Sequence, residues 1–184
     1  CRLRARSLSS YGDYLKVLEN PVEKDERRMV VDLLTTNETY FFREPQHFDV
    51  LGDWVGRQRG PLHLWSAASS SGEEAFSMAM CVAENARTQD WSIFASDLSH
   101  RVLERARSAT YAMEQAEQFP PGWLKRHCLR GIEESAGLFR IGQPLRHRVT
   151  FAEVNLARPL PQGVGPFDVI FLRNCLLYTS PSPR

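Results

Sequence analysis

Apolar and polar positions along this chain follow two different periods, which predicts alternating strands and helices. Short apolar runs predict strands at residues 62–67, 91–97, 149–156 and 167–172. After the first run, Phe76, Met80 and Ala83 share one face of a predicted helix, spaced for packing on a sheet. The last run is nearly all apolar, as in the centre of a parallel sheet covered on both faces. This order predicts an α/β fold with a doubly wound sheet.

The turn after the first predicted strand consists of small residues, 68–72, and leads into the helix. Ser71 and Glu74 have the spacing of a capping box, which predicts that the helix begins there. In open α/β sheets such a turn lets a ligand approach the backbone, and N–H groups at the helix start attract its negative end. We therefore expect a nucleotide-like ligand at this edge of the sheet.

Polar residues also follow the other predicted strands. Asp97 ends the second strand about 25 positions after the glycine turn, where a carboxylate suits the hydroxyls of a ribose. Alternatively, Asp97 caps a helix that begins near Ser99. Asn155 lies at the polar exit of the third strand, and Arg173 follows the fourth. Because the ends of parallel strands share one edge, these residues are expected around a single crevice.

Residues 35–44 combine short hydrogen-bonding side chains with three adjacent aromatic side chains and the fixed cation Arg43. Such a segment is suited to wall a pocket for a flat ring. On the alternative interpretation, Thr35 caps a helix, the aromatic side chains belong to the core, and Arg43 and Glu44 form a solvated pair.

Composition changes this picture little. With 184 residues, 42% hydrophobic and 24% charged, the chain can form one α/β core, and its net charge of +1 gives no reason to expect nucleic acid. No run approaches the roughly 20 apolar residues of a membrane helix, and no signal peptide is recognised. The four cysteines have neither paired nor metal-like spacing, so we expect reduced thiols in a cytoplasm and no metal. We also expect a monomer. Cys81 and Cys175 are expected to pack as small apolar groups, and His63 and His147 to be structural or solvated.

Four blocks, at residues 35–44, 65–77, 95–111 and 149–178, stand in an order and at a spacing that resemble one family. The chain is similar to the chemotaxis receptor methyltransferases of the CheR type, S-adenosylmethionine-dependent enzymes that esterify receptor glutamates. The resemblance implies a Rossmann-like methyltransferase sheet with a small β insertion and the remnant of an N-terminal helical domain. Two departures are mild: Ser71 stands where a Thr is usual, and Leu172 where a Cys is usual.

By this resemblance the site residues can be assigned. Glu74 would hold the methionine ammonium, with Glu73 as fallback, and Asp97 would hold the ribose. Arg43 and Tyr178 match positions beside the transferring methyl group, so they are the expected catalytic residues. The full set of expected contacts to S-adenosylmethionine, or to its product S-adenosylhomocysteine, is Asn37, Thr39, Arg43, Glu74, Asp97, Asn155, Leu156, Arg173 and Asn174.

The expected domain limits also follow from the resemblance. Residues 1–34 would be the helical remnant, whose arginines face acidic receptor helices or simply solvent. Residues 35–178 would be the methyltransferase domain, with the β insertion at about 119–148. Within it, 123–129 predicts a short helix, and 138–141 with 146–151 alternates like antiparallel strands. In some family members this insertion docks a receptor tail peptide; an inert hairpin is the alternative.

The last residues, 179–184, contain two prolines and are interpreted as foreign to the fold. The strand at 169–172 is therefore expected to expose an unpaired edge. The chain is expected to be inactive as it stands. Three functions remain open. The first is methylation of chemotaxis receptors at glutamate, and the second is the same chemistry in another bacterial signalling system. The third is a non-catalytic receptor-binding or nucleotide-binding module.

Overall fold

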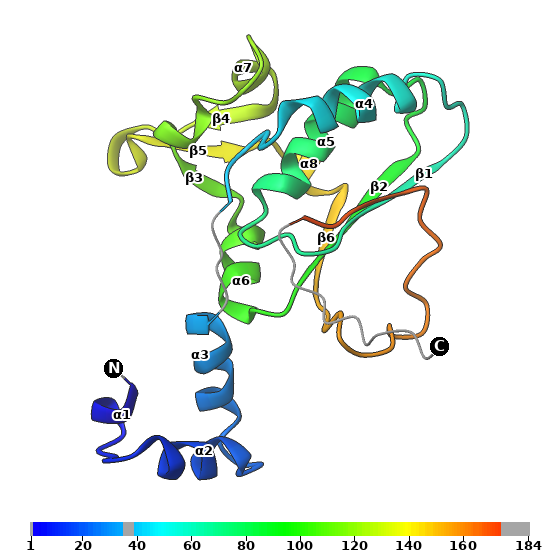
Figure 1. The fold of residues 1–184 in the computed structure, drawn as a ribbon. Coiled ribbons are helices and arrows are strands. Elements are labelled where there is room, and N and C mark those ends of the chain that lie inside the picture. The colour runs from blue at the N-terminus through cyan, green and yellow to red at the C-terminus, as the bar shows by residue number, and fades with distance from the viewer. Residues whose placement is uncertain (1, 35–38, 174–184) are drawn as a thin grey trace. The chain divides into compact units, whose positions relative to one another are not determined.

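The computed structural model describes residues 2–34 and 39–173. The chain divides into two compact units, residues 1–36 and residues 37–184 (Figure 1). None of the helices in the described ranges combines the length and the apolarity that a bilayer crossing requires.

The first unit contains three helices: α1 (Arg2–Ala5), α2 (Tyr11–Glu19) and α3 (Lys24–Leu34). Ser10 caps α2, because its hydroxyl accepts the N–H of Asp13 at 3.1 Å. The buried carboxylate of Glu26 joins α3 to the other helices. It accepts hydrogen bonds from Arg2 Nε at 2.9 Å and from the Tyr14 hydroxyl at 2.6 Å. These bonds, the one from Arg2 above all, hold the pKa of Glu26 far below its usual range, at about 2.

The second unit is built on a parallel sheet with strand order β6-β2-β1-β7. The predicted strands are present as β1 (Leu62–Ser66), β2 (Trp91–Asp97), β6 (Val149–Glu153) and β7 (Val169–Phe171). In the register of the two central strands, Leu62 lies opposite Trp91 and Ser66 lies opposite Ala95. The predicted α/β fold with a parallel sheet is therefore confirmed.

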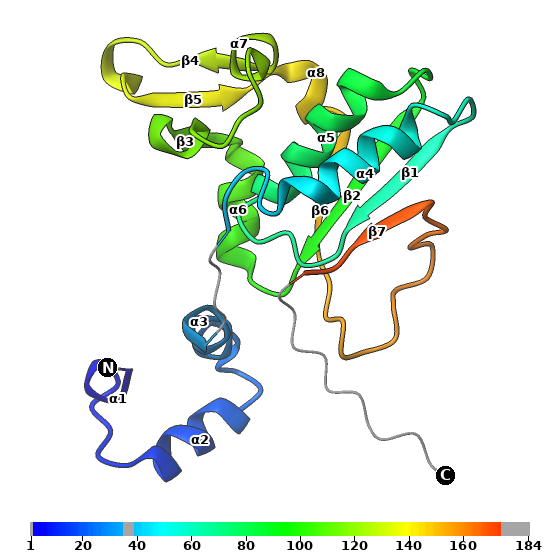
Figure 2. The ribbon, with the colours of Figure 1, turned by 45° about the horizontal axis from the view of Figure 1, so that its top comes forward.

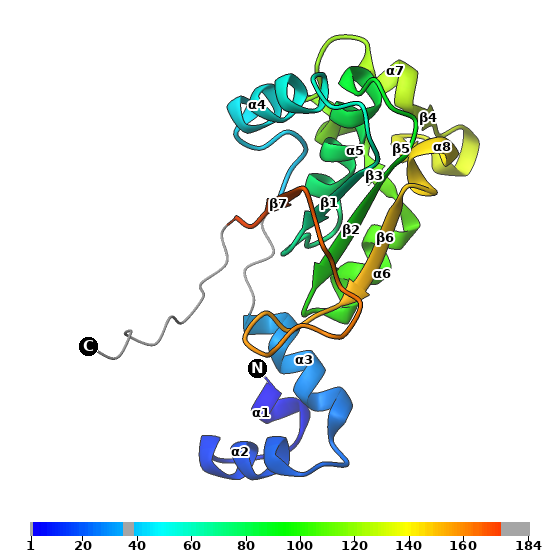
Figure 3. The same cartoon turned by 90° about the vertical axis from the view of Figure 1, so that its right-hand side faces the viewer.

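The core of this unit lies on one face of the sheet. Figures 2 and 3 show helices α4 (Pro45–Val55) and α5 (Glu73–Asn85) on the same side of β1 and β2. Leu64 and Ile93 point into this core and are fully buried, whereas their neighbours His63 and Ser92 are exposed. The helix α6 (His100–Ser108) follows β2. Alternating burial at the amino ends of β1 and β2 thus marks a sheet that is half-covered there, whereas both strands are buried on both faces near their carboxyl ends.

Two expectations about packing are wrong in the described residues. Ala83 was expected on the packing face of α5, but it is exposed, because the helix is buried only through Val82. The last strand was expected at the centre of a sheet covered on both faces. Instead β7 has β1 as its one described strand neighbour, and Ile170 is 52% exposed. The expected exposed edge is therefore present among the described residues.

The residues between α6 and β6 form a small antiparallel sheet with the order β3-β5-β4. Its elements are β3 (Thr110–Ala112), η1 (Met113–Ala116), α7 (Trp123–His127), β4 (Cys128–Arg130), η2 (Glu133–Ser135) and β5 (Leu138–Ile141). The predicted helix at 123–129 ends earlier, at His127. The predicted antiparallel pairing of 138–141 with 146–151 is wrong: α8 (Gln143–Arg146) separates them, and β6 runs parallel to β2.

Candidate functional site

The carboxyl ends of β1, β2 and β6 meet at one edge of the parallel sheet, as the sequence predicted. Ser66 ends β1, Asp97 ends β2 and Glu153 ends β6, and Asp97 lies opposite Glu153 in the sheet. Both α5 and α6 begin at this edge, so their N-terminal N–H groups lie near it. A ligand with polar and charged groups can therefore be bound here.

The turn between β1 and α5 is held by its backbone. The N–H of Ser69 donates to the Ser96 carbonyl at 2.9 Å, and the Tyr111 hydroxyl donates to the Ser71 carbonyl at 2.8 Å. Gly72 has φ +95°, and a Cβ there would come within 2.9 Å of the Tyr111 hydroxyl, so only glycine fits. The Ser69 hydroxyl is buried without a hydrogen-bond partner among the described residues, which leaves it available to a ligand.

The predicted capping box at this turn is wrong. Gly72 is the N-cap of α5, in the left-handed conformation, and no side chain caps the helix. The Ser71 hydroxyl donates instead to the carboxylate oxygens of Glu73, at 2.8 and 3.0 Å. Glu73 also accepts from Gln115 Nε2 at 3.2 Å, and its burial raises the pKa of its carboxyl group. Glu73 therefore belongs to an internal network that joins α5 to the segment after β3.

Asp97 links the carboxyl ends of two strands. One carboxylate oxygen accepts the N–H of Ser70 at 2.9 Å, and the other accepts the N–H of Ser99 at 3.0 Å. The N-cap of α6 is Ser99, whose hydroxyl accepts the N–H of Val102 at 3.3 Å, so Asp97 supports the helix start without being its cap. Each carboxylate oxygen of Asp97 keeps acceptor capacity beyond these bonds. The half-buried carboxylate can therefore accept hydrogen bonds from the hydroxyls of a ligand.

A second carboxylate, Glu74, connects α5 with the end of β7. Its Oε1 accepts the Ser66 hydroxyl at 2.7 Å, and its Oε2 accepts Arg173 Nε at 2.6 Å. Arg173 also donates to the carbonyl of Arg43 and lies 3.7 Å from the carboxylate of Glu44. Glu74 and Arg173 are both largely buried. A cationic group of a ligand at Glu74 would therefore share that carboxylate with Arg173.

The aromatic segment before α4 divides between core and edge. Phe41 and Phe42 are core residues, which agrees with the alternative interpretation of this segment. Tyr40 is 41% exposed, and the guanidinium of Arg43 lies 5.5 Å from the centre of its ring. Two phenylalanines thus fix the segment, and Tyr40 and Arg43 lie outside the core.

Comparison with known proteins decides the family. The family described as CheR methyltransferase, SAM binding domain, matches residues 37–184. The chain belongs to this CheR family. A chemotaxis protein methyltransferase of Escherichia coli K12 is 42% identical over 96% of this chain and 63% of its own length. The corresponding Salmonella typhimurium protein is 40% identical over 96% of the chain and 62% of its own length. Chemotaxis protein methyltransferase 2 of Pseudomonas aeruginosa is 40% identical over 96% of this chain and 64% of its own length.

The chain spans a little under two thirds of the length of these CheR relatives. Among solved structures, a protein-L-isoaspartate O-methyltransferase aligns with 69% of this chain and 28% of its own chain at 19% identity and a TM-score of 0.36, which is too weak a likeness to support an argument.

The residues expected from the CheR resemblance differ in where they lie. Arg43, Glu74 and Arg173 are brought together by hydrogen bonds. Asp97 is the last residue of β2. Asn155 and Leu156 follow β6 after Val154 and are half-buried, and the Asn155 side chain accepts the N–H of Ala157 at 2.9 Å. Thr39 is half-buried in the segment that leads to Arg43. The residues Asn37, Asn174 and Tyr178 lie outside the described residues.

Three contributors were not predicted: Ser66, Glu44 and Ser77. Ser66 is the last residue of a predicted strand, and its hydroxyl supports Glu74. Ser77 follows Glu74 by three positions, a spacing that places both on one face of α5. In the sequence, Ser66 could have been found by its place at the end of a predicted strand, and Ser77 by its spacing from Glu74. Within the described ranges, no group of three or more His, Cys, Asp or Glu side chains is placed to hold a metal.

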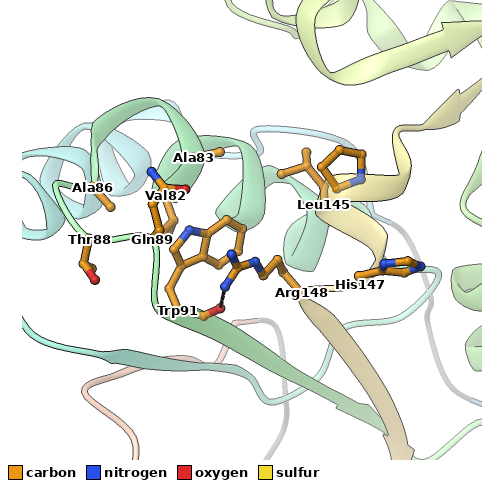
Figure 4. A pocket seen from close by; sticks show the side chains of 10 residues that line it. Val82, Ala83, Ala86, Thr88, Gln89, Trp91, Leu145, His147 and Arg148 are labelled. Atoms are coloured by element: carbon orange, nitrogen blue, oxygen red, sulfur yellow. Dashed lines mark hydrogen bonds between the residues drawn. The ribbon is translucent and has the colours of Figure 1, made fainter.

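A surface hollow lies at the opposite end of β2 and β6 (Figure 4). Arg148 lies there with its guanidinium 5.1 Å from the Trp91 ring centre, and it donates to the Trp91 carbonyl at 3.1 Å. None of the site residues expected for a CheR protein lines this hollow. We propose that the ligand site of this CheR domain lies at the carboxyl edge, where carboxylates and helix N-termini converge.

Proposed function

We propose that this protein transfers a methyl group from S-adenosylmethionine to glutamate side chains of chemotaxis receptors, forming glutamyl methyl esters. The observation that carries the proposal is the convergence of Asp97, Glu74 and Arg43 at the carboxyl edge of a CheR family sheet. The names of the similar proteins, all chemotaxis protein methyltransferases, support the choice of client. We propose that the reaction takes place in the cytoplasm, on the cytoplasmic domains of the receptors.

The described residues fit such a cofactor. Asp97 has acceptor capacity for the ribose hydroxyls, and the buried Ser69 hydroxyl has no partner among the described residues. Asn155 and Leu156, with Arg173 and Asn174, would line the adenosine and methionine sides, and Asn37 would contact the cofactor from the segment before the catalytic domain. Glu74 would receive the methionine ammonium as a second cationic partner beside Arg173. Thr39 and Arg43 would complete the site from the segment before α4.

The chemistry makes modest demands on the protein. When bound, S-adenosylmethionine supplies a methyl group already activated by its sulfonium sulfur. A carboxylate oxygen of the receptor glutamate attacks that methyl carbon, a C–O bond forms, and the C–S bond breaks with its electrons going to sulfur. An ionised glutamate is itself the nucleophile, so no general base is required. The work of the protein is to align the two reactants and to exclude water.

Arg43 is proposed to orient the reacting carboxylate. Its guanidinium keeps its charge at any physiological pH and offers a planar fork of donors that matches a carboxylate. The backbone carbonyl of Arg43 accepts a hydrogen bond from Arg173, just after β7, so Arg43 lies near the carboxyl edge. Tyr178 is proposed as its partner at the methyl group.

The test is transfer of labelled methyl from S-adenosylmethionine to the cytoplasmic domain of a chemotaxis receptor. We expect label on glutamate side chains, released as methanol by mild alkali, because esters hydrolyse there and methylated amines do not. A receptor domain with its accepting glutamates changed to alanine is the control and should stay unlabelled. Cofactor binding without transfer to any receptor would contradict the proposal and favour a non-catalytic binding module.

A further inference from the structure

Ser77 is a buried polar residue of α5, and it is not among the residues expected to contact the cofactor. It is fully buried, and its hydroxyl makes two hydrogen bonds. The hydroxyl donates to the Glu73 carbonyl at 2.7 Å, within the helix. It accepts the N–H of Phe42 at 2.9 Å, from a segment 35 residues earlier in the chain. The first bond is common for a serine inside a helix, but the second fixes a distant segment.

The segment that Ser77 contacts has an unusual backbone. Phe42 has φ +52° and Glu44 has φ +59°, values that side-chain-bearing residues seldom adopt. Such a conformation persists only where the surroundings hold it in place. The N–H of Phe42 is buried, so without Ser77 it would lose its acceptor. The hydroxyl of Ser77 therefore helps to determine the course of the chain at this point.

The backbone before and after Arg43 is tied to α5, through the Phe42 N–H and the Arg43 carbonyl. On one side, the Phe42 N–H is held by Ser77. On the other side, the Arg43 carbonyl accepts from Arg173, whose guanidinium is bound to Glu74. Glu74 and Ser77 lie three positions apart on α5 and thus on the same side of the helix. Figures 1 and 2 show α4, which follows this segment, running alongside α5.

We propose that Ser77 is a positioning residue for methyl transfer: by accepting the Phe42 N–H it fixes the backbone that directs Arg43 to the reacting carboxylate. This inference rests on the proposed function, because it assigns Arg43 to the reaction. Ser77 lies in the core and touches neither reactant, so its effect is exerted through the orientation of Arg43. A change at Ser77 should therefore alter the rate of transfer more than the affinity for the cofactor.

The experiment compares Ser77→Ala with Ser77→Thr, which keeps a hydroxyl, and with Cys81→Ala. Cys81 is one turn further along α5, is equally buried, and has its Sγ 3.3 Å from the Phe48 carbonyl of α4, so it controls for a general loss of packing. For Ser77→Ala we expect kcat for methyl transfer to fall about tenfold, with KM for S-adenosylmethionine changed by less than about threefold. Ser77→Thr should recover most of that loss, and Cys81→Ala should keep kcat within about twofold of wild type.

A double variant separates positioning from simple destabilisation. In an Arg43→Lys background, Ser77→Ala should add less than about twofold to the loss in kcat, because both changes disable the same step. If the losses in kcat of the two single variants multiply in the double variant, the proposal is overturned. Equal losses in kcat for Ser77→Ala and Cys81→Ala at matched thermal stability would also overturn it.

A measurement that does not depend on enzymatic activity tests the proposed contact between Ser77 and the backbone of Phe42 directly. In nuclear magnetic resonance spectra, the Phe42 amide should exchange with solvent faster in Ser77→Ala than in wild type, and the Arg43 Nε–H signal should shift or broaden. If both signals are unchanged, the proposal is wrong, even where Ser77→Thr does not fold. If wild-type protein transfers no methyl while these signals do change, the proposed function falls and the positioning of Arg43 by Ser77 stands.

Discussion

Similar polar groups have different roles at the two edges of the parallel sheet: the amino edge, where the strands begin, and the carboxyl edge, where they end. At the amino edge, Asp168 accepts the His63 N–H at 2.7 Å and Arg148 donates to the Trp91 carbonyl at 3.1 Å. Each of these bonds joins neighbouring strands of the sheet. At the carboxyl edge, Asp97 and Glu74 instead connect the turn after β1, the start of α6 and the end of β7.

The two edges differ in which backbone groups they present to a ligand. The amino edge has a hollow that α5 and α8 line in part, and α5 ends there with its carbonyl groups. The carboxyl edge has two helix N-termini, an unpartnered serine hydroxyl among the described residues, and two carboxylates. Direction of the backbone therefore distinguishes the two edges.

Stability should respond most strongly where a buried ion pair at the carboxyl edge is broken. Glu74→Ala leaves the largely buried Arg173 without its nearest carboxylate, so we expect the free energy of unfolding to fall by about 3 kcal/mol. Glu84→Ala is the matched control on the same helix, because its pair with Arg126 is far more exposed and should be worth about 1 kcal/mol or less. Urea denaturation of both variants measures the difference. Equal losses would show that Glu74 and Arg173 are not an anchor of this edge.

Methyl transfer should depend on an arginine of one edge only. Arg43→Lys keeps the charge but loses the planar fork, so we expect transfer to fall about tenfold, with cofactor affinity changed less. We expect a similar loss for Tyr178→Phe. Arg148→Lys at the amino edge should transfer methyl at the wild-type rate. Wild-type rates in both Arg43→Lys and Tyr178→Phe would leave those residues without a catalytic role.

A smaller effect concerns the pH dependence of two buried glutamates. Burial raises the pKa of Glu73, so the stability it contributes is present below the ordinary pKa of a glutamate and is lost as pH rises through its folded-state pKa. Glu73→Gln should therefore gain stability relative to wild type as pH rises from about 4 to about 8.

The stability that Glu26 contributes depends on pH in the opposite direction. Hydrogen bonds from Arg2 and Tyr14 lower its pKa to about 2, so its contribution is present above the ordinary pKa and is lost as pH falls toward that value. Glu26→Gln should thus be less stable than wild type at neutral pH, with the gap closing in acid. Thermal melts across this range test both signs, and parallel pH profiles for the two variants would contradict the assignment.

The strands and their polar ends could be predicted from sequence because they depend on local pattern. Residues 91–97 form the predicted strand, and β1 differs from its prediction by one residue. The capping box could not be judged from spacing alone, since the close approach of Tyr111 to Gly72 decides how α5 begins. The packing of Phe41 and Phe42 likewise depends on Phe119 and Trp123, which the fold brings in from far along the chain. Long-range contacts, which periodicity does not encode, account for these differences.

The most direct test of the account is calorimetric titration with S-adenosylmethionine and S-adenosylhomocysteine. Wild-type protein extended to the full length of its CheR relatives should bind both with dissociation constants on the order of micromolar. Asp97→Ala at the carboxyl edge should weaken both by roughly 1–3 kcal/mol, because charge-assisted hydrogen bonds are lost. Asp168→Ala, which removes a carboxylate that accepts a backbone N–H at the amino edge, should bind like wild type. No binding to this folded, extended wild-type protein, or equal weakening by the two variants, would contradict the placement of the site.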